Sequence, residues 1–154
     1  MDLTARTVHP LWCRNGVFVP IWGQTPAMTK RVADLGLVLD CADPEALAEF
    51  WAPALGYVSL GTVGSYVALF PDGAPGPKLL LQRVAEPKVA KNRMHFDIEV
   101  ADIEAEAARL AELGATRVSD GTLSEHGSSW VLMEDPEGNE FCVCDGGQPG
   151  DGPD

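Results

Sequence analysis

The sequence predicts an α+β fold built from two similar halves, each a β-α-β-β-β module. Residues 36–56 and 95–114 share one plan: an extended run, then Ala-Asp, a helix and a closing Gly. Three further strand candidates follow each of these segments. A half of about 60 residues is too small to bury a sheet alone, so we expect the two to pair into one domain whose curved sheets surround a cleft.

The two helices are predicted from their caps and from apolar spacing. Asp43 is placed as N-cap of the first helix, with Pro44 at the first helical position, where its missing N–H is not needed. Asp102 is placed as N-cap of the second, and Gly56 and Gly114 end the two helices. The apolar residues recurring at helical spacing are Leu47, Phe50, Trp51, Ala54 and Leu55, then Ile103, Ala107, Leu110 and Ala111.

Short apolar runs bounded by turn residues supply the remaining strands. They cover about 57–60, 65–70 and 79–84 in the first half, and 116–118, 129–134 and 140–144 in the second. Turn sequences at 71–73 and 135–139 stand before the last strand of each half. Residues 120–129, rich in Gly and Ser, are predicted as a loop in the position of a lid over the cleft.

The domain is expected to span residues 34–145, with modules at about 34–84 and 93–145. Residues 1–27 form an N-terminal extension, which is either an arm that packs on the domain or an upstream artefact with Met28 as the working start. Residues 146–154, rich in Gly, Pro and Asp, are expected to be a disordered tail.

Charge and hydropathy exclude several partners. The 154 residues carry a formal charge of −12, which opposes binding to nucleic acid and to anionic membranes. No apolar run reaches the roughly 18 residues of a membrane span. The extension lacks the unbroken apolar stretch of a secretory signal, so we expect a cytoplasmic protein whose four cysteines are reduced thiols.

Three sequence features together resemble a known family. They are the Asp-Pro-Glu-Gly-Asn turn at 135–139, Phe50-Trp51 followed by Leu55-Gly56-Tyr57, and the segment Lys-Asn-Arg-Met-His-Phe-Asp at 91–97. Over residues 34–145 the chain resembles the glyoxalase-like branch of the vicinal oxygen chelate superfamily, which includes bleomycin resistance proteins and dioxygenases. The resemblance implies a glyoxalase/bleomycin-resistance-type domain and a homodimer. The fold does not choose among the family's activities.

Alternation along the strands places candidate residues in the cleft. His95, Asp97 and Glu99 are expected to face it, with Met94, Phe96, Ile98 and Val100 packed on the helices. The repeat puts Gly36, Val38 and Asp40 at the corresponding positions of the first half. The resemblance puts Glu140, Cys142 and Cys144 toward the cleft on the last strand.

In metal-using members of the family, the resemblance implies ligands from the first and last strand of each half. His95 matches one of these positions, whereas Gly36 has no side chain with which to bind a metal. Cys142 occupies the position at which the family usually has Glu. The fourth ligand position falls on the predicted strand at 79–84, on the side of Leu80 or Gln82. We therefore favour no metal cofactor, and the alternative is a divalent ion held by His95, Gln82 and Cys142.

Two functions remain open. The favoured one is binding of a small organic molecule, such as a cationic compound, in a cleft between the modules. The residues expected to line it are Asp40, Tyr66, His95, Asp97, Trp130, Glu140 and Cys142. The alternative is a metal-dependent lyase, isomerase or dioxygenase-like enzyme that uses His95 and Cys142 as ligands. If the chain is an enzyme without a metal, His95 or Glu140 is the candidate general base.

Overall fold

The computed structural model describes residues 13–14, 17–18 and 35–146. The chain divides into two units, residues 1–33 and 34–154. In the first unit, β1 (Cys13–Arg14) and β2 (Val17–Phe18) pair antiparallel. The expectations for the rest of residues 1–27, for Met28 as a start and for residues 147–154 lie outside the described part. None of the described helices is long and apolar enough to cross a membrane.

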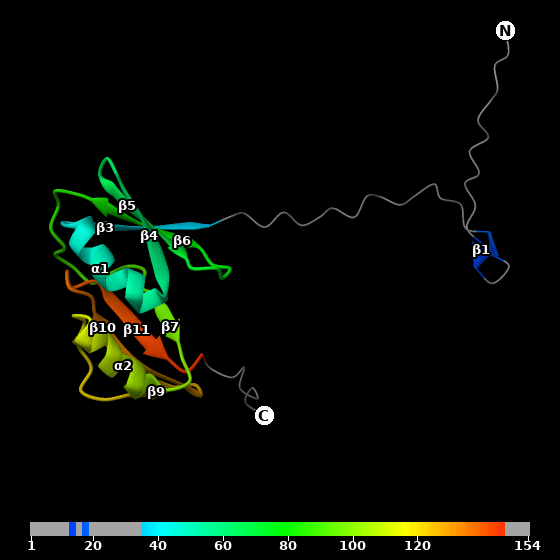
Figure 1. Ribbon diagram of the computed structural model, residues 1–154. Helices are drawn as coiled ribbons and strands as arrows, with labels where there is room; N and C mark the ends of the chain where they lie inside the picture. The colour runs from blue at the N-terminus through cyan, green and yellow to red at the C-terminus, as the bar shows by residue number, and fades with distance from the viewer. Residues whose placement is uncertain (1–12, 15–16, 19–34, 147–154) are drawn as a thin grey trace, which may run out of the picture. The chain divides into compact units, whose positions relative to one another are not determined.

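The second unit contains two curved sheets, one from each half (Figure 1). The first sheet has the order β3-β6-β5-β4, from β3 (Gly36–Cys41), β4 (Tyr57–Val63), β5 (Tyr66–Pro71) and β6 (Lys78–Arg83). The second has the order β7-β11-β10-β8, with β9 also on β10, from β7 (Asp97–Glu99), β8 (Thr116–Arg117), β9 (Leu123–Glu125), β10 (Ser128–Glu134) and β11 (Glu140–Cys144). In each half the first strand pairs in parallel with the last. The predicted two-module α+β fold is confirmed.

Each half carries one helix, which begins where its cap residue predicts. The helix α1 (Pro44–Leu55) starts after Asp43, whose carboxylate accepts the Ala46 N–H at 3.4 Å. The helix α2 (Ile103–Glu112) starts after Asp102, which accepts the Ala105 N–H at 3.0 Å. Helix α1 packs on the first sheet and α2 on the second, so each module has one covered face and one open face.

The segment expected to form a loop at 120–129 instead contains a hairpin. Strand β9 pairs with β10, and His126 and Gly127 close the connection between them with φ values of 51° and 79°. Two successive residues with positive φ match the twist of a two-stranded ribbon, which explains why so short a connection is stable. The loop prediction was wrong here because the strand β9 is held by its pairing with β10, which the Gly and Ser content of the segment did not reveal.

One apolar core joins the two halves. Trp51 of α1 lies edge-on to Phe96 and Phe141 of the second half, with both ring centroids at 5.3 Å. Its indole Nε1 donates to the carboxylate of Asp135 at 3.0 Å. Asp135 is only 3% exposed, so a buried side chain at the start of the second-half turn accepts a hydrogen bond from a helix of the first half.

The turn at 135–139 therefore connects the halves as well as two strands. The Asp135 carboxylate accepts the backbone N–H of Glu137 and of Asn139, both at 2.9 Å, and also the Asn139 side-chain amide. The Glu137 carboxylate reaches the start of α1, where it accepts the N–H of Ala42 at 2.7 Å and of Asp43 at 2.8 Å. The turn thus contacts both the start of α1 and, through Trp51, its middle.

The halves also meet along their first strands. Leu37 and residues 94–98 line one groove, and Val38 and Leu39 line a second one with His95 and Phe96. In β3 the odd-numbered Leu37 and Leu39 pack toward the core, whereas the even-numbered side chains are exposed. Residues of both halves therefore line these two grooves.

The Trp51 contact gives a test of how the halves are joined. We expect Trp51→Phe to lower the free energy of unfolding by about 1–3 kcal/mol, because it leaves a buried carboxylate short of a donor. Urea unfolding would measure the change. Trp130→Phe is the matched control, since Trp130 lies half-buried on an open face. Equal losses in the two variants would contradict the assigned role of the Trp51 indole N–H.

An ion pair between α2 and β8 gives a pH test. Glu104 accepts two hydrogen bonds from Arg117 at 2.6 and 2.9 Å and one from Thr122 at 2.6 Å, which lower its pKa to about 2. The stabilisation is complete above the ordinary pKa of 4.5 and is lost as the pH falls toward 2.

We therefore expect Glu104→Gln to be less stable than wild type at pH 7 and to converge with it near pH 2. Thermal unfolding between these pH values measures the difference. Glu112→Gln on the same helix is the control, because Glu112 makes no ion pair with any described residue. A constant gap between wild type and Glu104→Gln across the whole range would refute the linkage.

Candidate functional site

The open face of the second sheet carries a pocket of about 630 Å³, which we call the second-sheet pocket. Its polar lining residues are Lys91, Asn92, His95, Asp97, Glu99, Ser128 and Glu140. The remaining lining residues are Leu123, Trp130, Leu132, Cys142, Cys144 and Gly146. They come from β7, β9, β10, β11, the connection between the halves and Gly146 after β11, so no residue of the first half (34–84) lines this pocket.

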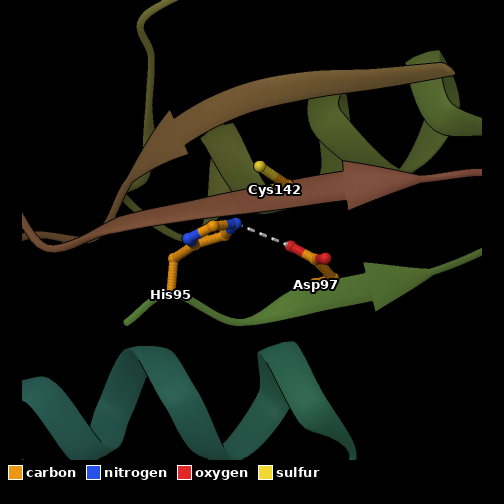
Figure 2. Close-up of side chains that lie close together, drawn as sticks. All are labelled: His95, Asp97 and Cys142. Carbon is orange, nitrogen blue, oxygen red and sulfur yellow. Dashed lines mark ion pairs between the residues drawn. The ribbon is translucent and has the colours of Figure 1, made fainter. Parts of the chain in front are cut away.

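The side chains of His95, Asp97 and Cys142 lie close together (Figure 2), and all three line this pocket. Parallel pairing sets Cys142 of β11 directly beside Asp97 of β7, and His95 lies two residues before Asp97 on the same side. The His95 Nε2 is 3.2 Å from a carboxylate oxygen of Asp97. One nitrogen, one oxygen and one sulfur atom of the three side chains all lie within 4.8 Å of one another.

The strand residues alternate largely as the sequence indicates. Phe141 and Val143 are fully buried behind the pocket, while Cys142 faces it. Phe96, Ile98 and Val100 pack against the core, as expected. Met94 does not pack against the core, since it is 60% exposed.

The pocket thiols are protonated at neutral pH. Burial raises the pKa of Cys142 to about 11, and the neighbouring Asp97 carboxylate contributes to the rise. Burial is also the main cause of the raised pKa of Cys144, whose thiol donates to the Ile98 carbonyl at 3.8 Å. Because the thiolate is the reactive form, neither cysteine is set up here as an activated nucleophile.

Glu140 lines the pocket, but its carboxylate is already bound. It accepts the Asn92 N–H at 2.9 Å and lies 3.1 Å from the ammonium group of Lys88. The Asn92 hydrogen bond, followed by that of Lys88, lowers the pKa of Glu140. In the structure, the carboxylate of this candidate general base is therefore bound to two residues of the connection between the halves, Asn92 and Lys88.

The expected residues of the first half lie elsewhere. Tyr66 and Asp40 flank Gln82 in the first sheet, and none of the three lines the second-sheet pocket. Asp40 lines a groove of about 940 Å³ between the halves, which we call the inter-half groove. The candidate set of His95, Gln82 and Cys142 is therefore not brought together in the chain, and Asp97 occupies the third place beside His95 and Cys142.

The sequence contained a signal for Asp97 as a partner of His95. His95 and Asp97 are two residues apart, so alternation turns both side chains toward one face of the predicted strand. The cysteine that faces them is Cys142, which stands two residues after Glu140 on the strand that follows the turn at 135–139. His126, which the lid prediction placed over the cleft, stands at the hairpin tip and does not line the pocket.

Residues 36–144 match the family described as glyoxalase-like domain. A solved glyoxalase/bleomycin resistance protein/dioxygenase from Nocardioides is similar with a TM-score of 0.61 at 20% identity, over 80% of this chain and 91% of that one. A glyoxalase/bleomycin resistance protein/dioxygenase family enzyme from Burkholderia phytofirmans PsJN has a TM-score of 0.59 at 16% identity, over 73% of this chain and 98% of that one.

A further solved structure, the oxidase ChaP-H2, has a TM-score of 0.58 at 20% identity, over 77% of this chain and 94% of the other. No curated protein matches the chain. At these identities the structural likeness establishes the fold only. Any function has to be argued from the residues of the pocket.

Proposed function

The chain belongs to the glyoxalase-like domain family, and on that premise we propose that it binds a small organic molecule in the second-sheet pocket. The observation that carries the proposal is the composition of this pocket. A volume of about 630 Å³ lies within the range of small-molecule sites, and apolar and polar groups converge on it. The proposed site therefore lies on the open face of the second sheet, whereas the sequence predicted a site between the modules.

The walls of the pocket support a ligand that is aromatic and positively charged. Trp130 and Leu132 from β10 provide an apolar surface, and Trp130 offers a ring face to a cation. Asp97 and Glu99 supply carboxylates from β7. We assign contacts with the ligand to His95, Asp97, Trp130 and Cys142, and we leave Asp40 and Tyr66 out of the set.

An aromatic cation with a fluorescent readout tests this assignment. We expect thioflavin T to bind the full chain, and Trp130→Ala to weaken binding about tenfold, which is the scale of one cation–π contact together with lost apolar area. Fluorescence titration gives the dissociation constants. Tyr66→Ala removes an aromatic side chain from the other open face and should leave binding unchanged. A larger loss in Tyr66→Ala than in Trp130→Ala would move the site to the first sheet.

A second candidate function uses a divalent metal, and a specific observation favours it. Histidine nitrogen, carboxylate oxygen and cysteine sulfur are the ligand types of zinc, and tetrahedral zinc holds such atoms about 3.5 Å apart. The His95, Asp97 and Cys142 atoms lie within 4.8 Å of one another, so small side-chain movements would suffice. The residues therefore fit a three-ligand site with open positions.

In this candidate function the three residues of the chain hold the ion, and Glu99 and Trp130 line the space for substrate beside them. A divalent ion bound there would supply Lewis-acid polarisation of substrate oxygens. His95 must be neutral and Cys142 deprotonated to bind, so the raised pKa of the thiol opposes metal uptake at neutral pH.

Calorimetric titration with zinc, with elemental analysis of protein purified without an affinity tag, separates the two functions. If the metal function holds, wild type binds one zinc per chain, and Asp97→Ala and Cys142→Ser each weaken binding by at least about tenfold. Gln82→Ala is the control and should bind like wild type. Absence of zinc binding in wild type removes the metal function and leaves organic-ligand binding standing.

Catalysis by a lyase or isomerase route, assembly as a homodimer and a cytoplasmic location stay predictions from the sequence. For catalysis without a metal, His95 is the better candidate base, because its side chain is 46% exposed at the pocket. Glu140 is 13% exposed and is occupied by Lys88 and Asn92.

A further inference from the structure

We propose that Glu140 latches the connection between the two halves over the second-sheet pocket, and that this latch sets the size of ligand the pocket admits. The connection runs from Val84 to Phe96, between β6 and β7, and we call residues 85–93 the strap. The size role rests on the proposed binding function, whereas the latch itself rests on contacts within the chain.

The latch consists of two charge-assisted contacts to one carboxylate. Glu140 Oε2 accepts the Asn92 backbone N–H at 2.9 Å and lies 3.1 Å from Lys88 Nζ. The Lys88 and Glu140 side chains are 27% and 13% exposed, so solvent screens this ion pair less than it would a surface pair. Contacts of this kind, to a shielded carboxylate, are stronger than neutral hydrogen bonds.

The two contacts bracket the middle of the strap. Lys88 and Asn92 are four residues apart, and both reach the first residue of β11, which is held in the sheet by β10. The strap has no regular secondary structure of its own. Its position therefore depends on a few side-chain and turn contacts rather than on a ladder of backbone hydrogen bonds.

The strap separates two spaces. Lys91 and Asn92 line the second-sheet pocket of about 630 Å³. Lys88, Asn92 and Arg93 line the inter-half groove of about 940 Å³. Asn92 borders both spaces, and its N–H is one of the two groups that Glu140 holds.

The physical consequence is a movable partition. With the latch closed, the strap limits a ligand to the second-sheet pocket. With the latch open, Asn92 is free to leave its place, and the pocket can extend into the inter-half groove. A carboxylate that looks like a general base in the sequence is thus a positioning residue for a wall of the site.

Limited proteolysis with trypsin tests the latch directly, because the strap carries three cleavage residues, Lys88, Lys91 and Arg93. We expect Glu140→Gln to be cut there about tenfold faster than wild type, since cleavage follows the population of the open form and a hydrogen bond to a charged group has been weakened. Mass spectrometry maps the cuts. Glu134→Gln is the matched control, as Glu134 pairs with Glu140 across β10 and β11 and loses the same charge.

A second variant covers the case in which Glu140→Gln does not fold, as judged by circular dichroism. Lys88→Met removes only the ion pair, and its cleavage is scored after Lys91 and Arg93. We expect a smaller acceleration than in Glu140→Gln. If both variants fold and both are cleaved at the wild-type rate, the latch is overturned. The latch is also overturned if only one of them folds and that variant is cleaved at the wild-type rate.

The size role is tested with two aromatic cations, thioflavin T and the bulkier rhodamine 6G. We expect Glu140→Gln to improve binding of rhodamine 6G relative to thioflavin T by about fivefold over wild type. Glu134→Gln should leave the ratio unchanged. An unchanged ratio in Glu140→Gln, with both dyes bound, overturns the size role.

The two failures are distinguishable. Faster cleavage of the strap while neither dye binds any variant overturns the proposed binding function, and with it the size role, and leaves the latch established. Dye binding by wild type together with unchanged cleavage in Glu140→Gln overturns the latch and leaves the binding function standing.

Discussion

The hydrogen bond from the Trp51 indole to Asp135 is the contact on which the rest of the domain depends. It joins a helix of the first half to the turn that precedes the last strand of the second. Burial of a carboxylate is costly unless its oxygens find donors, and Asp135 finds them in Trp51, in Asn139 and in the backbone of its own turn. The turn at 135–139 and the docking of α1 are therefore linked, because the indole N–H of Trp51 is one of the donors that the buried Asp135 carboxylate uses.

Strand β11 connects the turn at 135–139 to the second-sheet pocket. The turn ends at Asn139, and the next residue, Glu140, opens β11. Alternation from that point buries Phe141 and Val143 in the core beneath Trp51 and turns Cys142 and Cys144 to the open face. Parallel pairing with β7 then places Asp97 beside Cys142. Strand β11 therefore has two roles: its Cys142 lies beside Asp97 in the site, and its Phe141 packs against Trp51 of the first half.

The charged residues of the pocket are of two kinds: those that bind other parts of the chain, and those that remain accessible to a ligand. Glu140 is engaged by Lys88 and Asn92, and its role follows from those partners rather than from its residue type. Asp97 and His95 interact with each other and stay accessible from the pocket. The net charge of −12 is therefore a poor guide to the field that a ligand meets, because that field depends on the charged groups that line the pocket, such as Lys91, Asp97 and Glu99.

Local patterns in the sequence were sufficient for the α+β class, the repeat, both helix starts and the inward and outward sides of β7, whereas the sides of β11 were predicted from the family resemblance. Helix caps and strand alternation act over a few residues, so Asp43, Asp102 and the residues of β7 carry their own structural information. Tertiary structure alone decided that Gln82, Asp40 and Tyr66 lie apart from His95, that Asp97 joins it, and that Glu140 holds the strap. These outcomes depend on strand order, on parallel register and on contacts such as that between Asn92 and Glu140, which are 48 residues apart, and no local pattern encodes them.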